Sequence, residues 1–408
     1  MKTKLFTLFV AIVASICSIY AYETLSVAQA LEIGRSLEKG ASTSDTYTVI
    51  GYVAAIESEY NEGYHNQCYW ISDQRGGAIS EVFYIYRGKN DNPVQVGYKV
   101  SIETKIYRYT DLVIENANDN VTILDATASA TPSVLTGDCG ASGNNLTFQL
   151  NMSTWDLTIQ GSGRMVDSVQ SFPWQQQSLR YSVRSIQMPE GLTYIGQSAF
   201  ENCQKVSSVT IPENVSAVGK WAFYNCKALT TMNMPESVDS IGIAAFQGCA
   251  LTEPLYNARL FCFLPTNYSG SYSLPDGIVV VISYSFDGRK KLTSLDLPES
   301  VLRLGYRTFR NCTALQSITC RAVNPPTSKG ESFDGVDKSI PLYVPAESIE
   351  LYQTADEWSE FTNIQAIPST ADLELTEQEM KAYKLLQNGQ IYILRGEHIF
   401  DTQGKMIQ

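Results

Sequence analysis

Three residue types recur at intervals of 23 positions through the middle of the chain. Proline, phenylalanine and cysteine each repeat with this spacing, the phenylalanines at Phe200, Phe223 and Phe246. Pro235 and Pro275 are 40 residues apart, and the 23-residue spacing then resumes. A fixed period in this range is typical of a solenoid, in which each unit buries its apolar side only against its neighbours. The sequence therefore predicts a solenoid, whose outer surface is the expected functional element.

The residues before each repeated proline alternate between apolar and polar. Positions one and three before the proline are apolar, as in Ile211 and Val209, and the positions between them are polar. This alternation predicts a short strand with its polar side chains outward. Two outward rows follow, Gln187, Thr210, Asn233, Ser273 and Asp296 in the first, and Ser185, Ser208, Thr231, Ser271 and Ser294 in the second. We expect these rows to bind a partner, since solenoids bind through extended faces. A merely solvated sheet face is the alternative.

After each proline, apolar residues lead to a glycine, an Ala-Phe pair and a cysteine. The glycines are expected to supply a positive φ angle in a turn, and the phenylalanines are expected to fill the core. Cys203, Cys226 and Cys249 occupy equivalent positions, so their side chains should point the same way rather than converge. We expect buried free thiols, not disulfides or metal ligands.

The resulting order I-P-x-x-V-x-x-I-G-x-x-A-F-x-x-C resembles the BspA-like leucine-rich-repeat family. The segment from Cys139 to Trp174 resembles the N-terminal cap of that family, and Pro325 to Tyr352 resembles its terminal cap. The resemblance implies a mainly β leucine-rich-repeat solenoid over residues 138–367. It also implies adhesion, meaning binding of host matrix proteins, glycans or other bacteria. Three positions depart from the pattern: Ile282 replaces the glycine, Arg289 the cysteine and Arg321 the proline.

Residues 1–21 have the layout of a signal peptide, with Lys2 and Lys4 before an apolar run from Leu5 to Ile16. Export would place the mature protein outside the cytoplasm, secreted or on the cell surface. No later apolar stretch is long enough to span a bilayer, so no transmembrane segment is expected. The net charge is −12 and no basic run occurs, which argues against nucleic acid as a partner.

Residues 22–127 hold five short runs rich in Val, Ile and Tyr, which predict a small closed β-barrel. Details such as Tyr69-Trp70-Ile71 resemble OB-fold-like modules on exported proteins of host-associated anaerobic bacteria. OB folds often bind single-stranded nucleic acid or sugars. Tyr69, Trp70, Tyr84 and Tyr86 could form a stacking platform, or they could be half-buried strand residues. Residues 128–137, rich in Ala, Ser, Thr and Pro, are interpreted as a linker.

The sequence leaves two interpretations open for each of two further segments. Residues 253–272 contain Tyr256, Phe261, Phe263 and Tyr268, and form either a protruding aromatic hairpin that binds a partner or an enlarged coil with its aromatics inside. Residues 368–408 are interpreted as a linker followed by a hairpin-like tail, which resembles C-terminal sorting segments of proteins from the same bacteria. A small hairpin packed on the last coil is the alternative.

No motif for catalysis is present. The chain lacks the metal, phosphate-loop and nucleophile-elbow patterns, and its two histidines, His65 and His398, lie in separate regions. We therefore expect no catalytic residue, no metal, no cofactor and no enzyme activity. The sequence favours an exported interaction protein that binds a protein or glycan through the solenoid face. A glycan-binding accessory acting through the OB-like module and a purely structural surface protein are the alternatives.

Overall fold

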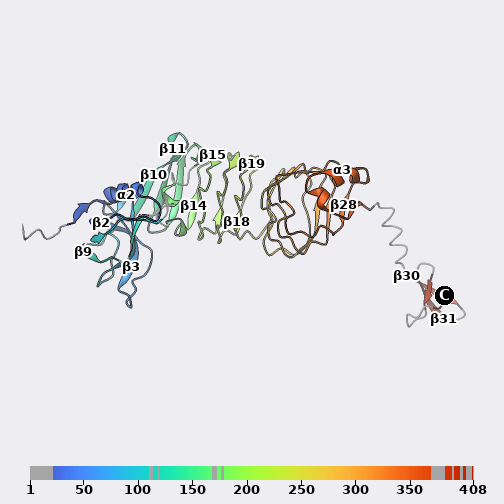
Figure 1. Cartoon of the computed structure of the whole chain (residues 1–408), viewed down its shortest axis with the longest axis horizontal. Helices are drawn as coiled ribbons and strands as arrows, with labels where there is room; N and C mark the ends of the chain where they lie inside the picture. Colours follow the sequence, from blue (N-terminus) through green and yellow to red (C-terminus); the bar gives the residue numbers. More distant parts are fainter. Residues whose placement is uncertain are drawn as a thin grey trace, which may run out of the picture.

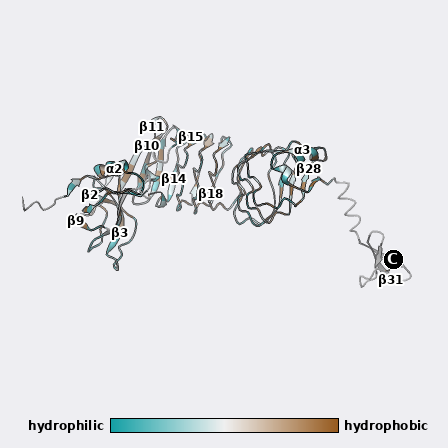
Figure 2. Cartoon of the chain, in the orientation of Figure 1, coloured by the Kyte–Doolittle hydropathy of each residue, from teal (hydrophilic) through white to brown (hydrophobic). Residues whose placement is uncertain are grey.

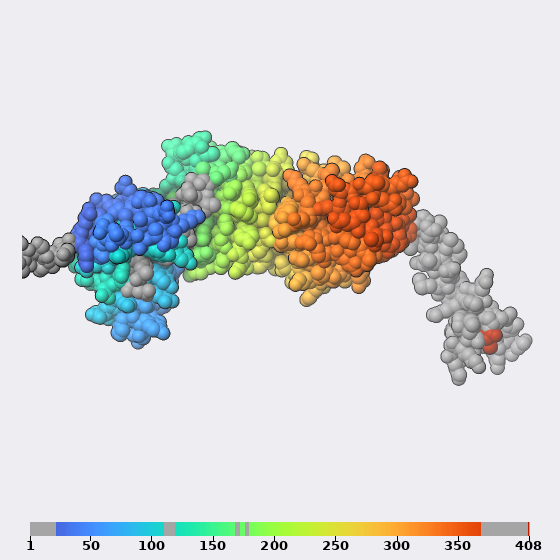
Figure 3. All heavy atoms as spheres, viewed as in Figure 1, coloured from blue at the N-terminus to red at the C-terminus, as the bar shows by residue number. Residues whose placement is uncertain are grey.

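The computed structural model describes residues 22–109, 114–117, 119–167, 172–175, 179–368, 382–387, 390–395, 398–400 and 407. The predicted signal peptide, residues 1–21, lies outside the described residues. Between residues 22 and 368 the described chain is elongated, with an N-terminal domain at one end and a mainly β solenoid extending from it (Figures 1 and 3). Hydrophobic and hydrophilic residues are interspersed along the coils (Figure 2). No helix in the described ranges is long and apolar enough to cross a bilayer.

The N-terminal domain is a curved sheet with one helix packed on it. Its elements are β1 (Glu23–Leu25), α2 (Val27–Ser36), β2 (Tyr47–Ile56), β3 (Asn66–Ser72), β5 (Phe83–Lys89), β6 (Lys99–Thr104), β7 (Tyr107–Arg108), β8 (Ile114–Ala117) and β9 (Val121–Asp125). The strand order is β7-β8-β5-β3-β2-β6-β9, and β1 pairs with β2. Helix α2 starts at a capping box in which Ser26 accepts from the Gln29 N–H and donates its own N–H to the Gln29 side chain.

The N-terminal domain joins the first coils of the solenoid through one strand pairing and one group of buried side chains. Strand β4 (Gly77–Ile79) pairs in parallel with β10 (Ser133–Gly140), at the edge of a sheet of order β14-β12-β11-β10-β4. The other strands of that sheet are β11 (Gly143–Asn151), β12 (Asp156–Gly161) and β14 (Ser185–Gln187). Trp70 from β3 meets Trp155, their rings 5.3 Å apart. Ala55, Trp70 and Tyr84 of the N-terminal domain thus belong to the core of the first solenoid coils, whereas the domain's own core, around Val49 and Phe83, is a separate cluster.

The predicted linker over residues 128–137 differs from the structure in its second half. Strand β10 begins at Ser133, which is buried, and Leu135 lies in the shared core. The small and polar composition suggested a linker, but the buried Leu135 and the pairing with β4 and β11 fix this half in the sheet.

The first half of the solenoid stacks short parallel strands in two columns. The column of order β13-β15-β17-β19, here called the β17 sheet, consists of β13 (Gly163–Arg164), β15 (Leu192–Ile195), β17 (Ala217–Val218) and β19 (Ser240–Ile241). In the other column β16 (Ser208–Val209) pairs with β18 (Thr231–Met232). The 3-10 helices η2 (Pro173–Gln175) and η3 (Leu179–Tyr181) lie before these coils and cover their N-terminal end.

The second half forms two further columns that pair with neither column of the first half. The β21 sheet has the order β20-β21-β23-β25-β27, from β20 (Leu255–Tyr256), β21 (Leu260–Phe263), β23 (Val280–Val281), β25 (Arg303–Leu304) and β27 (Thr327–Ser328). The β24 sheet has the order β22-β24-β26-β28-β29, from β22 (Gly270–Ser273), β24 (Leu292–Leu297), β26 (Ser317–Cys320), β28 (Leu342–Val344) and β29 (Ile364–Ala366). Helix α3 (Ile349–Thr354), with η4 (Ala346–Ser348) and η5 (Trp358–Glu360), closes this end. Figure 1 shows the first-half coils edge-on and the second-half coils as open rings.

A row of stacked rings runs through the core and is interrupted once. Phe200, Phe223 and Phe246 follow Trp174 with ring centroids 5.3 to 6.2 Å apart. A second row begins at Phe261, 4.9 Å from Phe286, and ends at Trp358. The buried side chains accordingly form separate clusters in the two halves. The expectation that the repeated phenylalanines fill the core is confirmed.

The repeat glycines have a different role from the one expected. None of Gly196, Gly219, Gly242 and Gly305 has a positive φ angle; that conformation occurs two residues later, at Ser198, Trp221, Ala244 and Arg307. A Cβ on Gly242 would lie 2.2 Å from the Lys220 nitrogen of the preceding coil, and one on Gly305 would lie 2.2 Å from the Ser283 nitrogen. Glycine is required because adjacent coils touch at this position.

The tail contains a three-stranded antiparallel sheet. Its strands are β30 (Ala382–Gln387), β31 (Gln390–Arg395) and β32 (His398–Phe400). The predicted hairpin-like tail is therefore present as three strands. Among the described residues these strands pair only with one another.

Candidate binding surfaces

The two predicted outward rows exist, each divided between the halves of the solenoid. Ser208 pairs with Thr231 in the first half, and Ser271, Ser294 and Ser317 are in register in the second. In the first half, four side chains of the rows are exposed: Gln187, Ser208, Thr210 and Thr231. Because β18 does not pair with β22, the rows do not form one uninterrupted face.

Two members of the rows are engaged within the protein. The Asn233 side chain accepts from the Ile211 N–H at 2.7 Å and donates to the Ile211 carbonyl at 2.9 Å, so it joins two coils. Asp296 receives two hydrogen bonds from the Arg321 guanidinium, at 3.0 and 2.7 Å. Ser294 beside Asp296 is half-buried. These three residues are less accessible than the sequence suggested.

Residues 253–272 form a short coil, in which β20 and β21 pair antiparallel as a small hairpin whose second strand is buried and does not protrude. The register pairs Phe261 with Val281 and Val281 with Leu304, which places Phe261 at the position of Ile241 in the repeat. Phe261 and Phe263 are buried, and Tyr268 is half-buried. Only Tyr256 of the four candidate aromatics is exposed, at 43%. A partner cannot reach Phe261 or Phe263 in this structure, because β21 is covered on both faces.

Strand β21 divides the two cores. Phe261 and Leu264 pack with the second-half core, whereas Leu260 and Cys262 pack with the first-half core. Ile282 from the outer face of the β21 sheet also belongs to the first-half core. The second half therefore covers the open end of the first half with the outer face of its β21 sheet.

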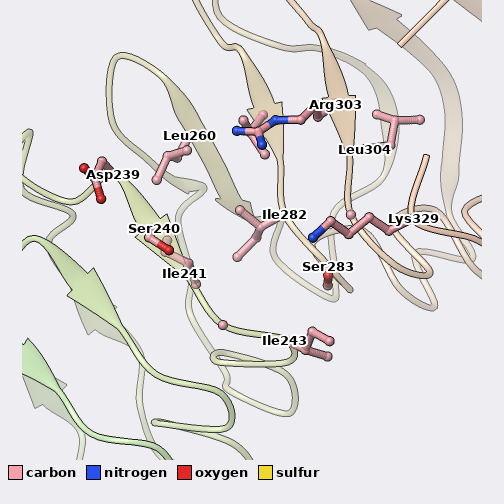
Figure 4. A pocket seen from close by; sticks show the side chains of 13 residues that line it. Asp239, Ser240, Ile241, Ile243, Leu260, Ile282, Ser283, Arg303, Leu304 and Lys329 are labelled. Atoms are coloured by element: carbon pink, nitrogen blue, oxygen red, sulfur yellow. The ribbon is translucent and has the colours of Figure 1, made fainter. Parts of the chain in front are cut away.

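A cleft of about 300 Å³ lies in the corner where the two halves meet. One wall is formed by residues 239–243, which include β19, and the facing wall by Leu260, Val280, Ile282, Arg303 and Lys329 of the second half. Figure 4 shows Asp239 on the first wall and the Arg303 and Lys329 side chains extending from the other. We call this hollow the corner cleft.

A second hollow, of about 450 Å³, adjoins the corner cleft at Ile243. It is lined by Trp221, Tyr224, Tyr284 and Tyr306 as well as Ile243. Trp221 is 37% exposed, and the Lys220 ammonium lies 3.8 Å from the centre of its ring. Tyr284 and Tyr306 meet edge to face at 5.8 Å. The repeat pattern did not indicate this aromatic surface, because its residues occupy variable positions of the turns.

The aromatic residues of the N-terminal domain do not form an open platform. Tyr69, Trp70 and Tyr84 are buried, and Tyr86 is half-buried. Burial raises the pKa of the Tyr84 hydroxyl well above its ordinary value, and a hydrogen bond to Glu57 adds to the effect. Trp70, Tyr84 and Tyr86 pack with the core of the first solenoid coils, whereas Tyr69 packs inside the domain. This agrees with the interpretation as strand residues.

The cysteines are free in the described part of the chain, as expected. Seven are buried and Cys68 is half-buried. The thiols of Cys226, Cys249 and Cys312 each donate to the phenylalanine carbonyl of the neighbouring coil, at 3.1 to 3.2 Å. Burial raises the pKa of Cys139 to about 12, of Cys312 to about 12 and of Cys320 to about 11.

No cluster of three or more His, Cys, Asp or Glu side chains that could hold a metal occurs among the described residues. His65 is 3.1 Å from the Tyr60 hydroxyl, in the loop between β2 and β3. The His398 side chain lies outside the part of the chain described.

The break between the halves left two signals in the sequence. Ile282 stands at the position of the repeat glycine, donates its N–H to the Phe261 carbonyl at 3.0 Å and packs its side chain with the first-half core. Arg289, at the cysteine position, is buried and donates to the Leu264 carbonyl at 2.8 Å. Both departures are visible in the sequence. They indicate a break only once the spacing of 20 residues is recognised, from Ile241 to Phe261 and from Phe261 to Val281.

Comparison with known proteins supports the repeat assignment. The model of the BspA type leucine-rich repeat region matches residues 177–257 and 258–369, in six copies. No curated protein matches the chain.

Solved leucine-rich-repeat structures are similar to parts of the chain. A leucine-rich repeat protein from Eubacterium ventriosum is 15% identical, over 58% of this chain and 85% of that one, with a TM-score of 0.28. A leucine-rich cell surface protein from Faecalibacterium prausnitzii is 16% identical over 60% and 98%, with a TM-score of 0.22. The pneumococcal vaccine antigen PcpA is 11% identical over 78% and 100%, with a TM-score of 0.28.

The stacked parallel strands, the stacked phenylalanines and the six matched copies agree with one another. Residues 177–369 of this chain are similar to the BspA type leucine-rich repeat region.

Proposed function

We propose that this chain is an exported interaction protein, secreted or held on the cell surface, that binds a protein partner through its solenoid without catalysis. The exposed, in-register side chains of the first-half rows carry the proposal. Ser208, Thr210 and Thr231 are exposed, and no hydrogen bond within the described residues occupies their side chains. Such a face can form hydrogen bonds with a partner at little ordering cost, because short side chains lose little rotamer entropy.

The family supports a protein partner more strongly than another class. Repeat solenoids of this kind present extended surfaces to other macromolecules. The proposed targets are host matrix proteins, with glycans and other bacteria as further classes. The net charge of the chain, −12, favours partners that are not polyanions.

The proposal is tested by a binding screen of the mature protein, residues 22–408, on arrays of matrix proteins and glycans. We expect saturable binding to at least one protein ligand and no turnover of glycosidase or peptidase substrates. Turnover that vanished on replacing a single carboxylate or serine would contradict the non-catalytic assignment.

The second candidate is glycan binding by the N-terminal domain, which we infer to be an OB-like barrel. An isolated parallel bridge between Lys89 and Asn120 joins β5 to the start of β9, which supports a nearly closed sheet. The buried Trp70 and Tyr84 give no stacking platform. A hollow of about 530 Å³ on this domain, lined by Tyr22, Tyr107 and Glu103 among others, offers a place for a sugar. Glycan-array binding that disappears in Tyr107→Ala would favour this candidate.

We further propose that export uses residues 1–21 as a signal peptide and that the tail, residues 368–408, serves surface display. The tail sheet pairs with no strand of the solenoid in the described residues, which supports a separate role. Truncation at residue 386 is expected to leave the melting temperature nearly unchanged and to reduce the surface signal in cells. A large loss of stability would show that the tail is part of the folded solenoid end.

A further inference from the structure

We propose that the corner cleft binds an extended peptide segment of the partner, which pairs with β19 as an added strand and places an acidic side chain between Arg303 and Lys329. This inference adds the chemistry of the partner to the proposed function. It rests on the proposed function in one respect, that the partner is a protein.

The unpaired edge of β19 is the first observation. In every ordinary coil junction, backbone N–H groups of one coil donate to carbonyls of the previous one. Asp239 donates to the Ser216 carbonyl at 3.0 Å, and Gly242 donates to the Val218 carbonyl at 2.8 Å. The equivalent carbonyls one coil later are those of Asp239 and Ile241.

Those two carbonyls accept no hydrogen bond from any described residue. In the second half the matching acceptors are occupied, since Leu302 donates to Val279 at 2.9 Å and Gly305 donates to Val281 at 2.8 Å. The break therefore leaves one strand edge of the solenoid open, on the wall of a cleft. An open edge is a template for strand addition.

The facing wall is the second observation, and it suits a peptide in which apolar and polar residues alternate. Val280 is half-buried and Ile282 is buried, so the cleft has an apolar floor. Residues on one face of an added strand could contact this floor, because side chains of a strand alternate in direction. The volume of about 300 Å³ is enough for a short stretch of chain, at the lower end of the range for ligand sites.

The charge of the cleft is the third observation, and it selects the kind of peptide. Arg303 and Lys329 are exposed and line the cleft, and neither forms an ion pair with a described residue. By contrast, the nearby Arg307 and Arg310 are paired with Glu331 and Asp287. Two unpaired cations on one wall complement an acidic side chain, whereas the single carboxylate of Asp239 stands on the other wall.

A peptide accounts for these features better than a sugar does. The two free carbonyls lie two residues apart on one strand, the spacing at which backbone N–H groups of a paired strand repeat. The cleft also lacks an open aromatic ring for a sugar to stack on, since the residues lining it are aliphatic, charged or small.

The test is a selection of random linear heptapeptides displayed on phage, with residues 22–408 as the target, followed by affinity measurements on the synthetic peptides. We expect binders that contain Asp or Glu among alternating apolar residues. The variant R303E/K329E should weaken their Kd by about tenfold or more. The control K205E/K227E makes the same charge change at exposed positions remote from the cleft and should leave the Kd unchanged.

A second measurement does not depend on the folding of any variant. Methylation of alternate backbone nitrogens of the selected peptide removes the N–H donors on one edge. One of the two methylation patterns should abolish binding to the unaltered protein, and the other should be tolerated. Failure of the library to yield a binder, equal affinity for R303E/K329E, or indifference to both methylation patterns would each overturn the inference.

These outcomes are separable from those of the proposed function. The strand-row variant S208K/T210K/T231K should bind the selected peptides with unchanged affinity, because its substitutions lie outside the cleft. If matrix ligands bind on the array but the cleft variant retains them all, the interaction function stands and the cleft inference fails.

Discussion

At the residue scale, the repeat positions act through contacts between coils. Cys226 was expected to be a small packing residue, and the structure adds a hydrogen bond from its thiol to the Phe200 carbonyl, at 3.1 Å. Gly242 was expected to bend the chain, and instead it makes room for the preceding coil. In both cases the sequence pattern shows which residue type is required. The reason for the requirement is a contact with the preceding coil, which only the structure shows.

Replacement of Cys226 tests the thiol hydrogen bond. Packing alone would leave a serine hydroxyl without a partner, but the carbonyl of Phe200 can accept from it. We therefore expect C226S to lower the free energy of unfolding by about 1 kcal/mol. C226V, which cannot donate and adds volume, should cost more, about 1–3 kcal/mol. Denaturant unfolding measures both, and a larger loss for serine than for valine would contradict the hydrogen bond.

Alkylation tests the burial and pKa of the thiols. The thiolate is the reactive form, and burial raises the pKa of Cys312 to about 12 and of Cys320 to about 11. A raised pKa keeps a thiol protonated until the pH approaches that value, so these groups should be inert at neutral pH. With iodoacetamide at pH 7.5 the folded protein should react at the half-buried Cys68 first. Mass spectrometry showing equal modification of Cys312 would contradict this order.

At the element scale, the unusual feature is the short coil between β19 and β23. Its strand β21 is buried on both faces, because the core of each half packs on one side of it. The 23-residue period predicted every regular coil, since apolar spacing determines which residues stack. It could not predict how residues 250–274 fold, because two coils of 20 residues leave no repeated proline or phenylalanine to mark the register.

A pair of aromatic substitutions separates the two interpretations of this segment. Phe261 is fully buried and stacks on Phe286 at 4.9 Å, whereas Tyr256 is 43% exposed. We expect F261A to lower the free energy of unfolding by about 3–5 kcal/mol. Y256A on the same hairpin should change it by about half a kcal/mol or less. Equally small losses of stability for both variants would support the protruding hairpin instead.

At the scale of the whole molecule, the solenoid is a two-part body whose first half is continuous with the N-terminal domain. Trp70 of that domain packs on Trp155 of the solenoid, so the two are in contact where composition suggested only a linker. The repeat family, the caps and the outward rows could be predicted from the sequence. The divided rows and the corner cleft could not, because both arise where the two halves meet.

The central claim is that the outward rows of the solenoid bind a protein partner. The most direct measurement compares the affinity of the protein and of S208K/T210K/T231K for one ligand identified on the array. A control, T266K/N267K/T313K, carries the same charge on exposed side chains outside the rows. We expect the row variant to bind about tenfold more weakly or worse, with the melting temperatures of both variants close to that of the unaltered protein. Unchanged affinity of the row variant, together with loss of binding in Y107A, would place the site on the N-terminal domain and contradict the account.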